Sequence, residues 1–363
     1  MLLCLCGDVM TGRGVDQILP HAGDPRLHEP YVSDAREYVE LADARSGRIP
    51  RPVSWAYVWG DALAERDRLA AAAWIVNLET SITRADDVWR GKDVHYRMHP
   101  ANVACLTAAG IDVCVLANNH VLDYGRDGLV ETLDTLRQAG IAVAGAGRTR
   151  DEARRPAILE RQDGRVVVFA FGVETSGIPP DWAATDRRPG VDLLDDLSPV
   201  TADAVARQVR LARQPGDVIV ASIHWGPNWV DRIPDVHTRF AHALIDGGVH
   251  IVHGHSSHHP LAIEVYRGGL VLYGCRDFVD DYEGIAGDRS YRSDLVLMYA
   301  ATVDARTGGL AAVHLTPLQL RRMRLGLASP ADRQWLQRRL DAEGRRFGTR
   351  VEAAPDGRLA VRW

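Results

Sequence analysis

The stretch VIVASIHWG, residues 218–226, holds a pattern that recurs along the chain: an apolar run of strand length, followed at once by a polar side chain that can bind a metal or carry a proton. Comparable runs end at Asp8, at 77–79, at 118–120 and in the histidine-rich stretch 253–259. Near-continuous apolar strands separated by helical stretches are typical of a sheet that is covered on both faces. The pattern therefore predicts an α/β fold.

The remaining elements follow from periodicity. Helical spacing fits residues 128–139 and 238–246. After residue 260 the apolar runs are separated by Gly-rich turns, which is typical of antiparallel hairpins. These runs are 261–266, 270–273, 294–303 and 311–318. An Arg-rich amphipathic pattern over 333–346 predicts a surface helix near the C-terminus.

The chain length suits one large domain with an extension. We expect the domain to span residues 1–320, and residues 321–363 to form a helical and β extension that packs on it. Residues 20–54 contain five prolines and show no clear period. A long irregular stretch in a compact domain is often a lid or a binding loop, so we expect a lid-like insertion there.

Composition narrows the class of protein. The 363-residue chain has a net charge of −5 and no basic stripe, which argues against a nucleic-acid partner. Lys92 is the single lysine, so a mechanism through a lysine Schiff base is nearly excluded. Five cysteines without CxxC spacing indicate free thiols in a reducing compartment. Because we find no signal peptide and no apolar run near the roughly 20 residues of a membrane span, we expect a cytoplasmic protein.

The polar strand ends predict a metal site. In open α/β sheets, ligands bind in the crevice at the carboxyl ends of the strands. Carboxylates, an amide oxygen and imidazoles form a mixed oxygen and nitrogen set that suits divalent Zn, Mn or Fe. The set exceeds what one tetrahedral ion uses, which favours two ions about 3.5–4 Å apart. Taken singly, Asp8 could cap a helix and 118–120 could form a turn, so the prediction depends on their recurrence on successive strands.

The same motifs resemble those of a known family. They are GDVM (7–10), NLE (77–79), NNH (118–120), HWG (224–226) and GHSSH (254–258). They are similar to the bacterial CapA family, the poly-γ-glutamate capsule synthesis proteins, a branch of the calcineurin-like metallophosphoesterase superfamily. The resemblance covers about residues 2–300. It implies a metallophosphoesterase-like four-layer α/β/β/α sandwich, with the metal site at the C-terminal ends of the strands.

Carried over residue by residue, the resemblance implies six metal ligands. Asp8 belongs to the first ion, Glu79 takes the bridging position, Asn119 and His224 belong to the second ion, and His255 and His258 lie in the final histidine motif. The resemblance also implies that His120 contacts the leaving group and acts as a general acid, and that Arg13 contacts an anionic group.

Two positions depart from the superfamily pattern. Met10 stands where a histidine is usual, and a thioether is a poor ligand for a borderline ion. Ser257 stands where the last histidine is usual, and His258 follows one residue later. We therefore expect the first metal to be weakly held, differently ligated or absent. A later acidic stretch is interpreted as a loop with helix-cap character, although the sequence also allows it to bind an ion; it comprises Asp277, Asp280, Asp281 and Glu283.

Three functions are open at this stage. The first is a metal-dependent hydrolase that uses metal-bound hydroxide on a phosphoester. The second keeps the metal site but acts on an amide or γ-glutamyl bond, and the third is a non-catalytic accessory of polymer synthesis. In the first two cases the substrate is a small-molecule or peptide-like anion. Several arginines near the metals would favour a phosphate or a polyanion, and few would favour an amide. The candidate substrate-binding residues are Arg97, Arg276, Tyr57 and Trp59.

Overall fold

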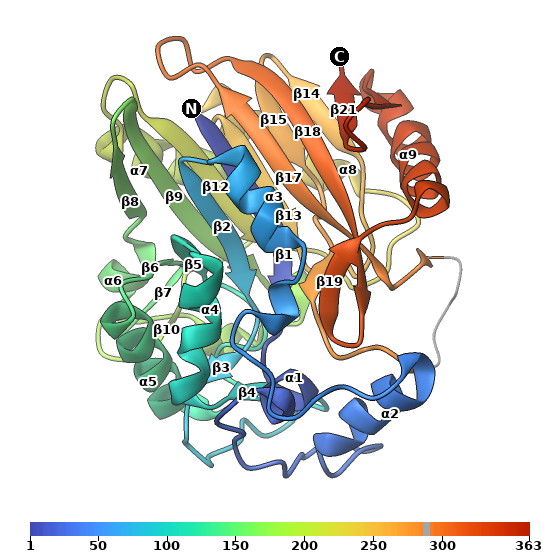
Figure 1. The fold of residues 1–363 in the computed structure, drawn as a ribbon. Coiled ribbons are helices and arrows are strands. Elements are labelled where there is room, and N and C mark those ends of the chain that lie inside the picture. The colour runs from blue at the N-terminus through green and yellow to red at the C-terminus, as the bar shows by residue number, and fades with distance from the viewer. Residues whose placement is uncertain (286–290) are drawn as a thin grey trace.

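The computed structural model describes residues 1–285 and 291–363. Two β-sheets pack face to face with helices outside them (Figure 1). Side chains of β12 (Val218–His224) show the layers. Val218 and Val220 belong to the core between the sheets, whereas Ile219 and Ile223 point to the other side and pack with two helices. The architecture is therefore the four-layer α/β/β/α sandwich that the motifs implied.

The first sheet is mixed and the second is mainly parallel. The first runs in the order β20 (Arg350–Ala353), β21 (Leu359–Arg362), β18 (Leu310–Arg321), β17 (Leu295–Val303), β1 (Leu2–Val9), β2 (Ala73–Leu78), β5 (Val113–Val115) and β6 (Ala142–Ala144), with β16 (Asp277–Val279) beside β1 and β19 (Arg324–Leu327) beside β18. The second runs in the order β11 (Leu193–Leu194), β9 (Gly164–Val173), β12, β13 (Ile251–His255), β15 (Gly269–Leu272) and β14 (Ile263–Tyr266), with β8 (Ala157–Arg161) beside β9.

Short pairs and helices complete the fold. The pairs are β3 (Ser81–Ile82) with β4 (Arg97–Met98) and β7 (Ala146–Gly147) with β10 (Gly190–Val191). The α-helices are α1 (Arg13–Ile18), α2 (Arg36–Ser46), α3 (Ala62–Leu69), α4 (Ala104–Ala109), α5 (Gly125–Gln138), α6 (Arg150–Arg154), α7 (Pro199–Ala212), α8 (Asp235–Asp246) and α9 (Pro330–Gly344). Among the described residues, no helix is both long and apolar enough to cross a membrane.

Most predicted elements are present, with shifted ends. The helices predicted at 128–139, 238–246 and 333–346 correspond to α5, α8 and α9. The predicted hairpins are also found, since β14 is antiparallel to β15 and β17 to β18. The free thiols are confirmed as well, because all five cysteines are buried and unpaired.

Two expectations need correction. The stretch 20–54 is not irregular throughout, because it contains α2. Tyr38, Val39 and Ala42 form the buried face of that helix, and the surrounding prolines hid this short periodicity from the sequence analysis. The strands after 260 do not form hairpins alone, because β15 also pairs in parallel with β13 and so extends the second sheet. At the C-terminal end, β21 pairs with β18, so the extension adds strands to the first sheet.

The position of β1 depends on a close approach of two backbones. β1 lies parallel to both β2 and β16. The backbone N–H of Asp8 donates to the carbonyl oxygen of Arg276 at 3.0 Å. A Cβ on Gly7 would lie only 1.6 Å from that same oxygen. Glycine at position 7 therefore allows β16 to reach β1, which places Asp277 opposite Asp8.

We predict that Gly7→Ala lowers the free energy of unfolding by at least about 3 kcal/mol, because the added methyl group must push the two backbones apart. Urea unfolding followed by circular dichroism measures the change. Gly326→Ala is the matched control, since its nearest neighbouring atom would lie 3.8 Å from the new methyl group. Equal urea midpoints for the two variants would show that the approach of β16 to β1 tolerates a side chain.

Candidate metal centre

The candidate centre lies where strands of both sheets end. Asp8 lies in β1, and Glu79 follows β2 directly. His224 and His255 are the last residues of β12 and β13, which are parallel and pair these two residues in register. Ligand atoms of Asp8, His224 and His255 all lie within 4.8 Å of one another, and the three side chains are buried. The fold thus brings together residues that are far apart in the sequence.

The imidazoles of His224 and His255 face each other. Their Nδ1 atoms are 2.8 Å apart, and Nε2 of His224 is 3.0 Å from Oδ1 of Asn119. Nε2 of His255 lies 2.9 Å from the hydroxyl of Ser222, which holds the ring from behind. Burial lowers the pKa of both histidines well below the usual range. Both rings are therefore neutral at pH 7, and neutral imidazole is the form that binds metals.

Two buried carboxylates complete the centre. The side-chain amide of Asn77 donates to Asp8 at 2.7 Å and to Glu79 at 3.2 Å, and the backbone N–H of Ser256 donates to Asp8 at 3.2 Å. Burial, and then the negative charge of Asp277, raises the pKa of Asp8 to about 7. Burial and the charge of Asp8 likewise raise the pKa of Glu79 well above its usual range. Carboxylates so placed need a cation nearby to stay ionised.

His120 lies beside the centre and is oriented by Asp123. Its Nδ1 is 2.6 Å from Oδ2 of Asp123, and its Nε2 is 3.8 Å from the carboxylate of Glu79. Lys92 donates to the other oxygen of Asp123 at 2.5 Å. Burial lowers the pKa of His120 to about 4, although the charge of Asp123 acts in the opposite direction. At neutral pH the ring is therefore neutral, donates through Nδ1 to Asp123, and presents Nε2 as an acceptor.

His258 occupies a neighbouring position rather than the three-residue group itself. Its Nδ1 lies 2.8 Å from Oδ1 of Asp277, and its ring packs edge-on against Tyr282. The hydroxyl of Tyr282 donates to the sulfur of Met10 at 3.4 Å. Tyr282 therefore links Met10 to His258, which in turn contacts Asp277.

The two buried arginines predicted to meet substrate have other partners. Arg13 pairs with Asp281 and with Glu29, so its charge is taken by carboxylates of this chain. Arg276 is also fully buried, and its guanidinium donates to backbone carbonyl oxygens of His258, Ser293 and Leu295. In this structure Arg13 balances buried acids and Arg276 fixes the segment that leads into β16.

The other three predicted substrate-binding residues are not brought to the centre. Trp59 is a core residue whose indole N–H donates to the carbonyl oxygen of Cys105. Tyr57 donates to the carbonyl oxygen of Arg322, and Arg97 pairs with Asp86. Trp59 and Tyr57 are held by contacts across 46 and 265 positions of the chain, which the sequence alone did not reveal.

Sequence reasoning missed three polar residues of the site. Asn77 lies two residues before Glu79, and this spacing could have indicated that its side chain lies near the carboxylate of Glu79. Asp123 lies three residues after His120, close enough in sequence to be suggested as its partner. Lys92 is the only lysine among 43 basic residues, yet it was used only to exclude lysine chemistry. In the structure it bonds the carboxylate that orients His120.

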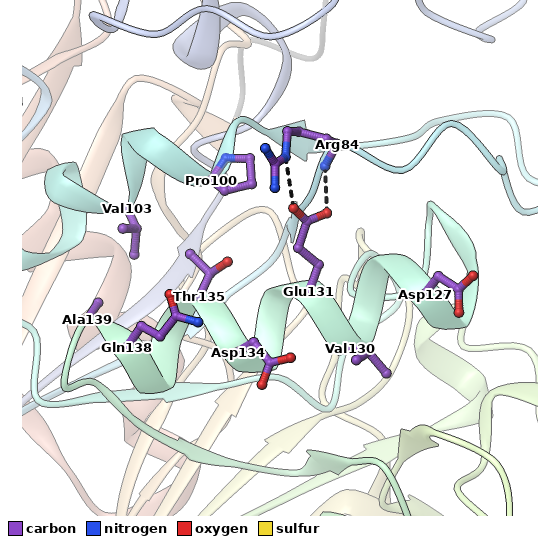
Figure 2. A pocket seen from close by; sticks show the side chains of 10 residues that line it. All are labelled: Arg84, Pro100, Val103, Asp127, Val130, Glu131, Asp134, Thr135, Gln138 and Ala139. Atoms are coloured by element: carbon purple, nitrogen blue, oxygen red, sulfur yellow. Dashed lines mark hydrogen bonds and ion pairs between the residues drawn. The ribbon is translucent and has the colours of Figure 1, made fainter.

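A surface hollow of about 610 Å³ lies elsewhere, along α5 (Figure 2). Arg84 reaches across its rim and pairs with Glu131 at 3.1 Å. The hollow is lined by none of the candidate ligands, and it belongs to the helical layer rather than to the strand ends. The candidate centre is therefore defined by its side chains and not by the size of a cavity.

The comparison with known proteins agrees with the family resemblance of the motifs. The family model for "Bacterial capsule synthesis protein PGA_cap" matches residues 2–282, which include every candidate ligand. A probable polyglutamine synthesis accessory protein of Mycobacterium tuberculosis is 49% identical over 359 residues, covering 98% of this chain and 94% of that protein. The capsule biosynthesis protein CapA of Bacillus anthracis is 25% identical, covering 88% and 67%. Among solved structures, TT1561 of Thermus thermophilus matches with a TM-score of 0.39 at 10% identity, covering 85% and 96%.

The raised pKa of Asp8 predicts a pH-dependent loss of stability in chelator-treated protein. Its pKa rises from 3.8 to about 7 on folding, so the folded chain holds the proton more tightly than the unfolded chain. Stability therefore falls as the pH rises from about 4 to about 7, by up to about 4 kcal/mol from this residue.

The measurement is urea unfolding of the wild type and of Asp8→Asn across this pH range in the presence of chelator. The difference between the two isolates Asp8 from the buried histidines, which lose stability in the opposite direction, toward acid. We expect the wild type to become less stable relative to Asp8→Asn as the pH rises. A difference that stays constant with pH contradicts the buried, ionisable position of Asp8.

Proposed function

The chain belongs to the PGA_cap family of bacterial capsule synthesis proteins, and from this premise we propose that it is a metal-dependent hydrolase. The observation that carries the proposal is the buried group of Asp8, His224 and His255. Burying a carboxylate against two neutral imidazoles is costly unless a cation joins them. Packing alone therefore does not account for this group.

The donor set fits a borderline divalent ion. Asp8 supplies a carboxylate oxygen, and His224 and His255 supply imidazole nitrogens. Glu79 and Asn119 add oxygens at 3.9 Å and 3.0 Å from Nε2 of His224. Zn²⁺, Mn²⁺ and Fe²⁺ prefer such mixed sets. When bound, these ions supply an activated water and stabilise negative charge that develops on the attacked group.

His120 is placed to move the proton that hydrolysis requires. Because Asp123 holds its Nδ1–H, the neutral ring offers Nε2 as a proton acceptor. Once protonated there, His120 can return the proton to the leaving atom, as a general base and then a general acid. Asp123 stabilises the imidazolium between the two steps, and the ammonium of Lys92 keeps Asp123 ionised. This arrangement extends the general-acid role expected from the motif.

The pairing of the arginines supports an amide or γ-glutamyl bond as the bond cleaved. An arginine that binds a phosphoester must have donors that remain available for its oxygens. Arg13 is paired with acids, and Arg276 donates to backbone carbonyls. A carbonyl centre needs less positive charge than a phosphate dianion. The second candidate bond is the phosphoester, which the superfamily resemblance favours.

A non-catalytic accessory role is the second candidate function. The printed name of the Mycobacterium tuberculosis relative describes a probable accessory protein of polyglutamine synthesis. In that role the buried group would bind a metal for stability, and His120 would have no proton to move. The two functions therefore differ in what the metal-loaded protein does to substrate.

The test is a hydrolysis assay on protein loaded with Mn²⁺, Zn²⁺ or Fe²⁺. One substrate set contains γ-glutamyl amides and oligomers of γ-linked glutamate, and the other contains phosphomonoesters and phosphodiesters. We expect turnover on the first set, which chelation abolishes and added metal restores. His255→Ala should lose both bound metal and turnover. Turnover on the phosphoester set alone would reassign the bond, and no turnover at full metal occupancy would favour the accessory role.

We predict that Asp123→Asn lowers kcat by about 10²–10⁴-fold with little change in bound metal, because an amide no longer fixes the tautomer of His120 or stabilises its protonated form. Steady-state kinetics and elemental analysis measure the two quantities. Asp127→Asn is the matched control, since it removes an exposed carboxylate four residues away. Equal kcat values for the two variants would remove His120 from the proposed mechanism.

A further inference from the structure

Asp277 is a buried carboxylate with one oxygen that the described chain leaves unsatisfied. Only 1% of the residue is exposed. Its Oδ1 lies 2.8 Å from Nδ1 of His258, but its Oδ2 has no hydrogen-bond partner among the described residues. Buried carboxylate oxygens are strong acceptors, and native structures satisfy nearly all of them by protein, water or an ion. Such an oxygen needs a partner from outside the described chain, either water or an ion.

Asp277 lies directly beside Asp8. β16 and β1 are parallel, and the two residues are paired in register. Paired residues of neighbouring strands project from the same face of the sheet, with their backbones about 4.8 Å apart. Two buried carboxylates therefore lie side by side, and the imidazole of His258 contacts one of them.

The arginine and lysine side chains around this pair do not neutralise it. Arg13 pairs with Asp281 and Glu29. Arg276 directs its guanidinium to backbone carbonyl oxygens. Lys92 pairs with Asp123. Within the part of the chain that the structure describes, His258 is the basic side chain that hydrogen-bonds Asp277. A divalent cation would supply the missing positive charge.

The segment around Asp277 is held in place on both sides. The backbone of Arg276 accepts a hydrogen bond from Asp8, and Gly7 leaves room for this contact. The guanidinium of Arg276 donates to the carbonyl oxygen of His258 at 3.1 Å, which ties the histidine loop to the same segment. Asp277 and His258 are therefore held against each other, and Asp277 beside Asp8 on the neighbouring strand, before any ion binds.

We propose that Asp8, Asp277 and His258 form a second cation pocket, adjoining the centre at His224 and His255. Two carboxylates and one imidazole suit Mn²⁺ or Zn²⁺. The proposal rests on the proposed function for the ion at His224 and His255, and it adds Asp277, which the motif resemblance does not include. It also explains how the ion that the motifs assign to Asp8 is held although Met10, whose sulfur accepts from Tyr282, contributes no strong ligand.

Asp280 provides a matched control. It belongs to the same acidic segment, it is 2% exposed, and one of its carboxylate oxygens also lacks a partner among the described residues. Its other oxygen accepts from the backbone N–H of Tyr282, and the residue is not paired with Asp8 in the sheet. Asp280→Asn therefore removes one buried carboxylate charge without touching the proposed pocket.

The experiment titrates chelator-treated protein with Mn²⁺ alone. Bound equivalents are measured by equilibrium dialysis, and electron paramagnetic resonance reports whether two Mn²⁺ ions are coupled. We expect two equivalents and a coupled spectrum for the wild type and for Asp280→Asn. Asp277→Asn should bind the second ion about 10–100-fold more weakly or lose it, and its spectrum should show isolated Mn²⁺. His258→Gln, which leaves both carboxylates in place, should give the same loss and covers the case in which Asp277→Asn does not fold.

Two results overturn the pocket: a wild-type chain that binds a single Mn²⁺, or an Asp277→Asn variant that keeps two equivalents with unchanged affinity. The second result would leave Asp277 as an ion-pair partner of His258. Failure of the pocket is distinct from failure of the proposed function. A wild type with one bound ion and turnover keeps the hydrolase, whereas two coupled ions without turnover keep the pocket and remove the hydrolase.

Discussion

The burial of Asp8 beside Glu79, between neutral imidazoles, is the constraint on which the rest of the structure depends. An ionised carboxylate in such surroundings is unstable unless hydrogen bonds and a cation compensate for lost water. Asn77 supplies hydrogen bonds to both acids. Asp123 and Lys92 form a separate ion pair behind His120, so they do not supply that cation. A cation held by Asp8, His224 and His255 would supply the compensation that these side chains do not give each other.

The fold meets this constraint by bringing together the carboxyl ends of strands from both sheets. β1 and β2 bring the acids, and β12 and β13 bring the imidazoles in register. The apolar interiors of these strands bury both sheet faces, and the polar side chains gather toward the carboxyl ends. Gly7 then allows β16 to approach β1, and this places Asp277 beside Asp8. Packing and chemistry are thus assigned to different parts of the same strands.

The sequence predicts this division well because strand and metal-ligand signals are both local. Runs such as 218–223 show the strands, and the residues that end them show the ligands. Contacts across long distances are different: Arg13 finds Asp281 across 268 positions, so no local pattern could show that its charge is already paired. Asp123 is an intermediate case. It lies three residues after His120, so their spacing in the sequence could have suggested that the two side chains are partners. The helix within 20–54 was hidden because its buried face is short.

The central claim is that the buried strand ends bind a metal, and anomalous X-ray diffraction tests it most directly. Crystals grown with Mn²⁺ or Zn²⁺ would be measured on both sides of the absorption edge of the metal. The account predicts an anomalous peak bounded by Asp8, His224 and His255, with Asn119 and Glu79 next to it. A fully loaded crystal in which the peak lies elsewhere, while His224 and His255 still hydrogen-bond each other, would contradict it.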